Sequence, residues 1–164
     1  MKIYEYQSII NESTIKVADY CRYGTLELII EEIKKNNIDG ELAELGVYRG
    51  DFCKYMNKEF PKRKLYLFDT FNGFVDSDIE VDVKSNFTEK QWFNDVKNFE
   101  NTSVNFVVSK MKYPNNCVVR KGYFPNTIPE YEITYSLVSI DCDLYLPILE
   151  GLRYFYPRMN VGGI

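Results

Sequence analysis

The feature that most constrains this chain is a short apolar run that ends in a glycine turn and continues into an amphipathic segment. The stretch Gly40–Gly50 reads GELAELGVYRG, with Gly46 and Gly50 after the apolar run. A buried strand, a glycine turn and a helix let a backbone approach a bound cofactor, because a Cβ at the turn would be in the way. A second apolar run, 65–68, ends in Asp69. This acid follows the turn by about 20 residues, where doubly wound folds place a carboxylate on ribose hydroxyls. The pair predicts a site for a nucleoside-containing cofactor.

The glycine turn does not match the common nucleotide motifs. The sequence has no G-x-x-x-x-G-K-[ST] string, and a dinucleotide fingerprint would need a third glycine beside Gly46 and Gly50. Glu44, two residues before the first glycine, would repel a pyrophosphate and suits a ligand with an ammonium or sulfonium group. The alternative is a tight turn whose glycines serve geometry only.

Apolar periodicity along the chain alternates between strands and helices. Thr25 and Asp51 are expected to act as N-caps of the first two helices. The segment 104–111 has helical spacing, although its β-branched residues leave a strand as the alternative. We expect strands at residues 41–45, 64–68, 117–119 and 137–140, and helices from residues 25, 52, 88, 104 and 147. The alternation predicts a doubly wound α/β fold, with a mostly parallel sheet and helices on both faces.

Three further segments have weaker patterns. Residues at about 72–90 are acidic and contain glycine, which indicates an insertion loop that either caps an active site or is a solvated surface loop; composition favours the latter. Four apolar residues near the amino terminus indicate a short packed segment: Ile9, Ile10, Ile15 and Val17. The last helix is expected to bury one apolar face, formed by Ile148, Leu149, Leu152, Phe155, Tyr156 and Met159.

An acidic pair follows the strand at 137–140, which is predicted to be the most buried strand of the chain. If this strand continues to its tip, the carboxylates of Asp141 and Asp143 project from the same side. They would then lie at the edge of the sheet that also carries Gly46 and Asp69, where open α/β sheets bind ligands. Two close carboxylates attract a cation, and Mg²⁺ prefers oxygen ligands. The alternative for Asp143 is that it caps the next helix.

Composition restricts the class of protein. The 164 residues, 45% of them apolar and 27% charged, suit one globular domain over 1–164. A net charge of −4 without a long basic run disfavours nucleic acid. No apolar run or amino-terminal signal indicates a membrane or secretion, so we expect a cytoplasmic protein. The four cysteines are scattered and histidine is absent, which disfavours zinc and disulfides and leaves carboxylate, lysine, tyrosine or cysteine as a general base.

Four motifs of the chain together resemble the macrocin O-methyltransferase (TylF-like) family. These are ELGVYRG at 44–50, DTFNGF at 69–74, KGYFPNTIP at 121–129 and SIDCDLY at 139–145. Members of this family use S-adenosylmethionine to methylate sugar hydroxyls of natural products and glycans. The resemblance runs from about Arg22 to the end of the chain. It implies the Rossmann-like fold of class I methyltransferases, with S-adenosylmethionine and Mg²⁺ as cofactors and a sugar as the acceptor.

The resemblance also implies roles for individual residues. Asp69 would hold the ribose of the cofactor, Asp141 would ligate Mg²⁺, and Asp143 would be the general base that deprotonates the acceptor hydroxyl. The methionine part of the cofactor would be bordered by Glu44, Gly46, Tyr48, Arg49 and Gly50. A carboxylate base is consistent with a chain that contains no histidine.

The chain departs from the family pattern at its carboxyl end. In the family, a strand after the Gly-Gly turn ends in two acids that complete the metal site, and further strands follow, whereas this chain ends at Ile164. We therefore expect a fold that lacks its C-terminal strands, an exposed edge on the strand before Asp141, and weak or absent catalysis by these residues alone. A cofactor-binding module without catalysis and an NAD-dependent oxidoreductase stay open as alternatives, although Glu44 disfavours the second. Whether the chain forms a homo-oligomer is also left open.

Overall fold

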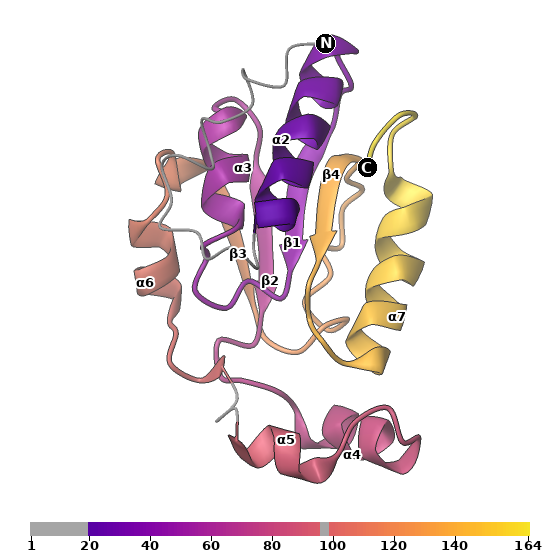
Figure 1. The fold of residues 1–164 in the computed structure, drawn as a ribbon. Coiled ribbons are helices and arrows are strands. Elements are labelled where there is room, and N and C mark those ends of the chain that lie inside the picture. Colours follow the sequence, from indigo (N-terminus) through magenta and orange to yellow (C-terminus); the bar gives the residue numbers. More distant parts are fainter. Residues whose placement is uncertain (1–19, 96–98) are drawn as a thin grey trace.

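The computed structural model describes residues 20–95 and 99–164, and a four-stranded parallel sheet lies at its centre (Figure 1). The segment predicted around Ile9–Val17 and the predicted helical residue Val96 lie outside the described residues. The strands are β1 (Glu41–Leu45), β2 (Leu65–Asp69), β3 (Cys117–Lys121) and β4 (Tyr135–Ile140). Their order is β3-β2-β1-β4, with every neighbouring pair parallel. From β1 the strand order runs through β2 to β3 on one side, whereas β4 lies on the other side of β1. Doubly wound folds bind ligands at such a switch point.

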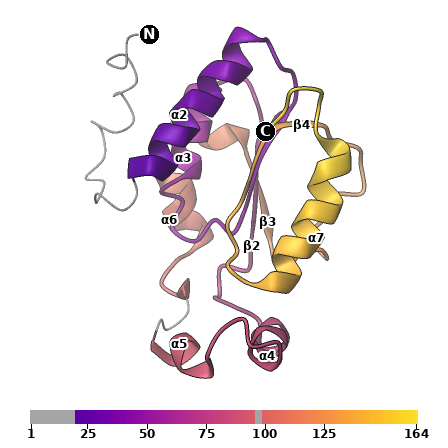
Figure 2. The ribbon, with the colours of Figure 1, turned by 45° about the vertical axis from the view of Figure 1, so that its right-hand side comes forward.

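Helices cover both faces of the sheet, as the alternating pattern predicts (Figure 2). On one face lie α2 (Tyr20–Lys35), α3 (Cys53–Glu59) and α6 (Val104–Ser109), and on the other lies α7 (Tyr145–Phe155). Alternate residues of β1 supply the two cores: Leu42 packs in the first, and Ala43 and Leu45 pack in the second. None of the helices in residues 20–95 and 99–164 has both the length and the apolar character needed to cross a membrane.

β1 and β2 form the buried centre of the sheet, whereas β4 lies at its edge. The prediction that the strand at 137–140 is the most buried was wrong, because Val138 and the two residues after it are only half-buried. β4 has the predicted edge position, but the expectation that this edge is exposed was wrong, because another segment of the chain covers it. Residues 159–164 run along this edge: the Val138 N–H donates to the Ile164 carbonyl at 2.9 Å, and the Asn160 N–H donates to the Tyr135 carbonyl at 2.8 Å.

Both predicted N-caps were wrong. Thr25 lies inside α2, because the buried face of this helix extends back to Tyr23, whose ring packs edge-to-face on Tyr55 at 5.4 Å. Asp51 does not cap α3, because its carboxylate is 2.8 Å from the Lys110 ammonium instead. Long-range contacts of these side chains therefore decide both cases.

The helix predicted from 104 is confirmed as α6, so the alternative of a strand was wrong. The apolar face predicted for the last helix was partly wrong. Phe155 is buried, but Leu152 and Tyr156 are 52% and 81% exposed, and Tyr154 is buried in their place. The helix is rotated toward Tyr154 because that ring packs between Phe68 and Phe124 on the second face of the sheet.

The acidic segment at about 72–90 contains a helix, so its interpretation as a loop was wrong. α4 (Asp76–Lys84) and then α5 (Lys90–Asp95) lie beyond the ends of the strands (Figure 1). Two of its acids point inward: Asp78 and Asp82 are only 3% and 5% exposed. The Tyr123 hydroxyl donates to Asp78 at 2.9 Å, and the Tyr145 N–H donates to Asp82 at 3.2 Å. The acids of α4 therefore anchor it to the rest of the protein, which composition alone does not reveal.

Candidate functional site

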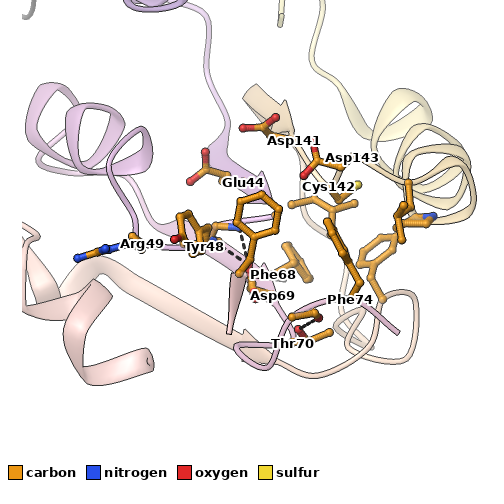
Figure 3. Close-up of a pocket in the computed structure, with 18 of the residues that line it drawn as sticks. Glu44, Tyr48, Arg49, Phe68, Asp69, Thr70, Phe74, Asp141, Cys142 and Asp143 are labelled. Carbon is orange, nitrogen blue, oxygen red and sulfur yellow. Dashed lines mark hydrogen bonds between the residues drawn. The ribbon is translucent and has the colours of Figure 1, made fainter. Parts of the chain in front are cut away.

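The strand ends open into one pocket of about 320 Å³ (Figure 3). Glu44 and Asp69 line it from β1 and β2, and Asp141 and Asp143 line it from the segment that follows β4. The structure thus brings together the acids that the sequence analysis singled out. A volume of this size falls at the lower end of the range for small-molecule sites, about 300–1,000 Å³.

Gly46 is required by the sheet itself. Its φ is +87°, and a Cβ built there would lie 2.6 Å from the carbonyl carbon of Asp141, which crosses over the turn. Its N–H donates to the Phe68 carbonyl at 2.9 Å. We expected a cofactor to approach the backbone at this glycine. In the structure, the glycine allows the turn after β1 to lie close to the backbone after β4.

Two other predicted cofactor residues lie less favourably. Gly50 does not line the pocket, and a Cβ there would lie 2.8 Å from a methyl group of Val107 on α6. Arg49 lines the pocket, but its guanidinium lies 5.0 Å from the centroid of the Phe106 ring and extends toward α6 (Figure 3). Gly50 therefore lies outside the pocket, and the guanidinium of Arg49 is directed toward α6.

Asp69 joins the turns that follow β1 and β2. One carboxylate oxygen accepts hydrogen bonds from the Val47 and Tyr48 N–H groups at 2.7 and 2.8 Å, and the other accepts from the Phe71 N–H at 2.6 Å. A carboxylate has about four lone-pair positions. One position therefore remains for another donor, such as a ribose hydroxyl.

Glu44 is a buried acid without a full set of partners. It lines the pocket, the residue is 1% exposed, and its Oε2 has no hydrogen-bond partner among the described residues. Burial raises the pKa of Glu44 to about 8, although a hydrogen bond with Cys53 and the charge of Arg22 oppose this shift. An uncompensated buried carboxyl favours the arrival of a cation, because the cation removes the penalty for ionising it.

Asp141 and Asp143 do not project as neighbours on one strand, so that prediction was wrong. β4 ends at Ile140, and Asp143 has a φ of +60° in the left-handed region. Burial, and then the charge of Asp141, raises the pKa of Asp143 above its ordinary value. The alternative role of Asp143 as a helix cap is also wrong, since α7 has no side-chain cap from its own N-cap residue Leu144.

Asp141 accepts a hydrogen bond from the guanidinium of Arg22 on α2, and the two form an ion pair. Within residues 20–95 and 99–164, no group of three or more acidic or cysteine side chains could hold a metal ion. Mg²⁺ takes about six oxygen ligands. Asp141 is already paired with Arg22, and water and substrate would have to supply most positions around a Mg²⁺ ion, so a metal requirement stays a prediction.

Tyr48 was predicted to border the cofactor, but the rings beside it in the pocket were not predicted. An aromatic wall runs from Tyr48 through Phe99 to Phe74, with ring centroids 4.7 and 5.3 Å apart. Tyr48, Phe99 and Asp143 all have φ values between 48° and 60°. Strained backbone of this kind costs about 1–3 kcal/mol per residue and gathers at functional sites. Tyr123 belongs to the motif KGYFPNTIP at 121–129, whereas no sequence pattern pointed to Arg22.

The chain is similar to known proteins in both sequence and fold. The family model described as Macrocin-O-methyltransferase (TylF) matches residues 16–164. Demethyldecarbamoylnovobiocin O-methyltransferase of Streptomyces niveus is 25% identical over 157 residues, which cover 87% of this chain and 57% of that protein. Mycinamicin III 3''-O-methyltransferase of Micromonospora griseorubida is 22% identical over 154 residues, which cover 87% and 59%. The chain thus spans less than two thirds of the length of these curated relatives.

Solved structures show the same fold. The O-methyltransferase NovP superposes with a TM-score of 0.63 at 25% identity, over 85% of this chain and 62% of that chain. CalS11, a calicheamicin methyltransferase, superposes with a TM-score of 0.56 at 18% identity, over 96% and 72%. An apo structure of CalS11, described as a TDP-rhamnose 3'-O-methyltransferase, gives a TM-score of 0.50 at 16% identity over the same shares of the two chains. The predicted α/β methyltransferase fold is confirmed.

Proposed function

The chain belongs to the macrocin O-methyltransferase (TylF) family, and from this premise we propose that it binds S-adenosylmethionine and methylates a sugar hydroxyl of a natural product or glycan. The observation that supports this most is the convergence of Glu44, Asp69, Asp141 and Asp143 on one pocket at the strand ends. This pocket lies beside the crossover between β1 and β4, the position expected for a nucleoside ligand. The family argues against an NAD-dependent oxidoreductase.

The cofactor would be held by groups from two strand ends. Glu44 would face the positive charges of the cofactor, because the buried Oε2 of its carboxyl has no hydrogen-bond partner among the described residues. Asp69 has one lone-pair position left for a ribose hydroxyl. Gly46 and Tyr48 would border the methionine part from the turn between these acids. Arg49 and Gly50 would support the turn from behind rather than contact the cofactor.

The cofactor supplies a methyl group on a positively charged sulfur. Asp143 would accept the proton of the acceptor hydroxyl as the O–CH₃ bond forms and the S–CH₃ bond breaks, which leaves S-adenosylhomocysteine. A general base works best when its pKa lies near the working pH, and the pKa of Asp143 is raised toward that range by burial and by Asp141. Most of the acceleration would come from positioning, since the displacement requires the three reacting atoms in line.

The test is methyl transfer from radiolabelled S-adenosylmethionine to a panel of glycosides, with the protein in excess so that a single turnover is detected. Wild-type protein should label a glycoside. Asp143→Asn should lower the rate by about 10²- to 10⁴-fold, the usual contribution of a general base, and should still bind S-adenosylhomocysteine. Parallel reactions with EDTA and with Mg²⁺ test the predicted metal requirement.

The outcomes separate the three functions considered. S-adenosylhomocysteine binding without any transfer would contradict the proposed reaction and favour a binding module without catalysis. Binding of NAD in place of S-adenosylhomocysteine would contradict the proposed cofactor. A rate for Asp143→Asn equal to that of wild type would contradict the role of Asp143 while leaving the reaction intact.

A further inference from the structure

We infer that Arg22 on α2 receives the α-carboxylate of the cofactor's methionine moiety, opposite Glu44, which receives its α-ammonium. This inference rests on the proposed function and adds a binding residue from outside the four sequence motifs. It makes the part of the pocket lined by Arg22 and Glu44 a receptor for a zwitterionic amino acid group, as opposed to a general site for adenosine derivatives.

Arg22 reaches the pocket from α2, which lies outside the sheet. Its backbone belongs to α2, yet its side chain lines the pocket and pairs there with Asp141 across 119 residues of sequence. Its guanidinium carbon lies 4.5 Å from the centroid of the Phe52 ring, another lining residue. This ring contact and the Asp141 pair hold the guanidinium over the strand ends, since arginine stacks well on aromatic faces.

Acids outnumber arginines among the residues that line the pocket. Its lining includes six acids, Glu44, Asp51, Asp69, Asp78, Asp141 and Asp143, and only two arginines. Arg49 extends toward Phe106 on α6, away from Glu44, Asp141 and Asp143 (Figure 3). A ligand carboxylate entering this acidic pocket needs a cation, and Arg22, which pairs with Asp141 of the lining, is the arginine placed to supply it. Arg22, Glu44 and Asp143 all line this pocket.

Arg22 and Glu44 both have hydrogen-bonding capacity that the described residues do not use. A guanidinium has five N–H donors. Within the described residues, the Arg22 guanidinium donates through Nη2 to Asp141, so donors remain for a second carboxylate. The Oε2 of Glu44 is buried and without a partner in the same part of the chain. A cation acceptor and an anion receptor thus face one pocket, as the two charges of an amino acid require.

This arrangement predicts which ligand groups each residue recognises. S-adenosylhomocysteine carries both charges, its decarboxylated analogue keeps only the ammonium, and methylthioadenosine has neither. Loss of the Arg22 guanidinium should therefore weaken only the first ligand, and loss of the Glu44 charge should weaken the first two. A general effect on the fold would change all three affinities together.

The experiment is isothermal titration calorimetry of wild type, Arg22→Gln, Arg22→Lys and Glu44→Gln with these three ligands. Arg22→Gln should raise the Kd for S-adenosylhomocysteine by about 10- to 100-fold, the usual loss of a hydrogen-bonded charge partner. Its Kd for the other two ligands should change less than about twofold. Arg22→Lys should lie between, because lysine keeps the charge but not the planar fork. Arg153→Gln, which removes an exposed arginine paired with Glu150 on α7, is the matched control.

Equal weakening of all three ligands by Arg22→Gln, or no change for S-adenosylhomocysteine, would overturn the inference. Thermal unfolding of each variant separates lost binding from lost folding. If wild type binds none of the three ligands, the proposed function fails and the inference fails with it. If wild type binds methylthioadenosine and S-adenosylhomocysteine equally, the adenosine site stands and the inference alone is wrong.

Discussion

Replacing Glu44 with glutamine should change how stability depends on pH. Burial raises the pKa of Glu44 from an ordinary value of 4.5 to about 8. The folded chain therefore retains a proton that the unfolded chain releases above pH 4.5. The unfolding free energy of wild type is highest below that pH, falls as the pH rises toward 8, and levels off above it. A glutamine amide does not titrate, so the Glu44→Gln variant should lack this dependence.

The magnitude follows from the two pKa values. At about 1.4 kcal/mol for each tenfold change in proton affinity, the gap between 4.5 and about 8 amounts to about 5 kcal/mol in full. Part of this loss has already occurred by pH 6. Between pH 6 and pH 9, wild type should lose about 3 kcal/mol of unfolding free energy relative to Glu44→Gln.

The assay is urea unfolding followed by circular dichroism at pH 6, 7, 8 and 9. Glu130→Gln serves as the matched control, because Glu130 is exposed in the loop before β4. The difference between this control variant and wild type should not change with pH. Any constant cost of burying the introduced amide cancels when the values at two pH values are subtracted. A difference between Glu44→Gln and wild type that stays constant from pH 6 to pH 9 would refute a buried, protonated Glu44.

Three further predictions concern the turns, α4 and the activity of the chain. Tyr123→Phe leaves the buried Asp78 without its hydroxyl donor and should cost about 1–3 kcal/mol. Hydrogen exchange at residues 76–84 should be faster than in a Tyr156→Phe control, and unchanged exchange would show that this bond does not anchor α4. Gly46→Ala forces a Cβ against the Asp141 backbone at a φ of +87° and should cost at least about 2 kcal/mol in thermal unfolding. Gly24→Ala inside α2 should instead stabilise by up to about 1 kcal/mol, and equal effects would contradict the argument from the turn. The activity of the chain on glycosides should depend on Asp143, and equal single-turnover rates of wild type and Asp143→Asn would contradict its role as the general base.

The positions of the strands, and the acids at their carboxyl ends, could be predicted because both depend on local patterns. The buried strands are nearly continuous apolar runs, such as Leu65–Phe68, and parallel strands bring their carboxyl ends to one edge whatever the details of packing. Asp69 and Asp141 could therefore be assigned to the same pocket from sequence alone. Four motifs in matching order then indicated the family that the comparison confirmed.

Other features depend on contacts between distant segments and left no local trace. The acids of α4 look like a solvated run, but Asp78 and Asp82 turn inward to meet Tyr123 and the start of α7. Arg22 pairs with Asp141 although the two are 119 residues apart in the sequence. Asp143 leaves the strand geometry through a positive φ that its residue type does not require. Each of these outcomes is set by tertiary packing, which overrides the local pattern.

The most direct test of the central claim is a crystal structure of this protein with S-adenosylhomocysteine. The ligand should lie in the pocket at the ends of β1, β2 and β4, with a ribose hydroxyl bonded to Asp69 and its amino group facing Glu44. Its sulfur should lie beside Asp141 and Asp143. A ligand bound elsewhere on the protein, or one whose amino acid group points away from Glu44, would contradict the account.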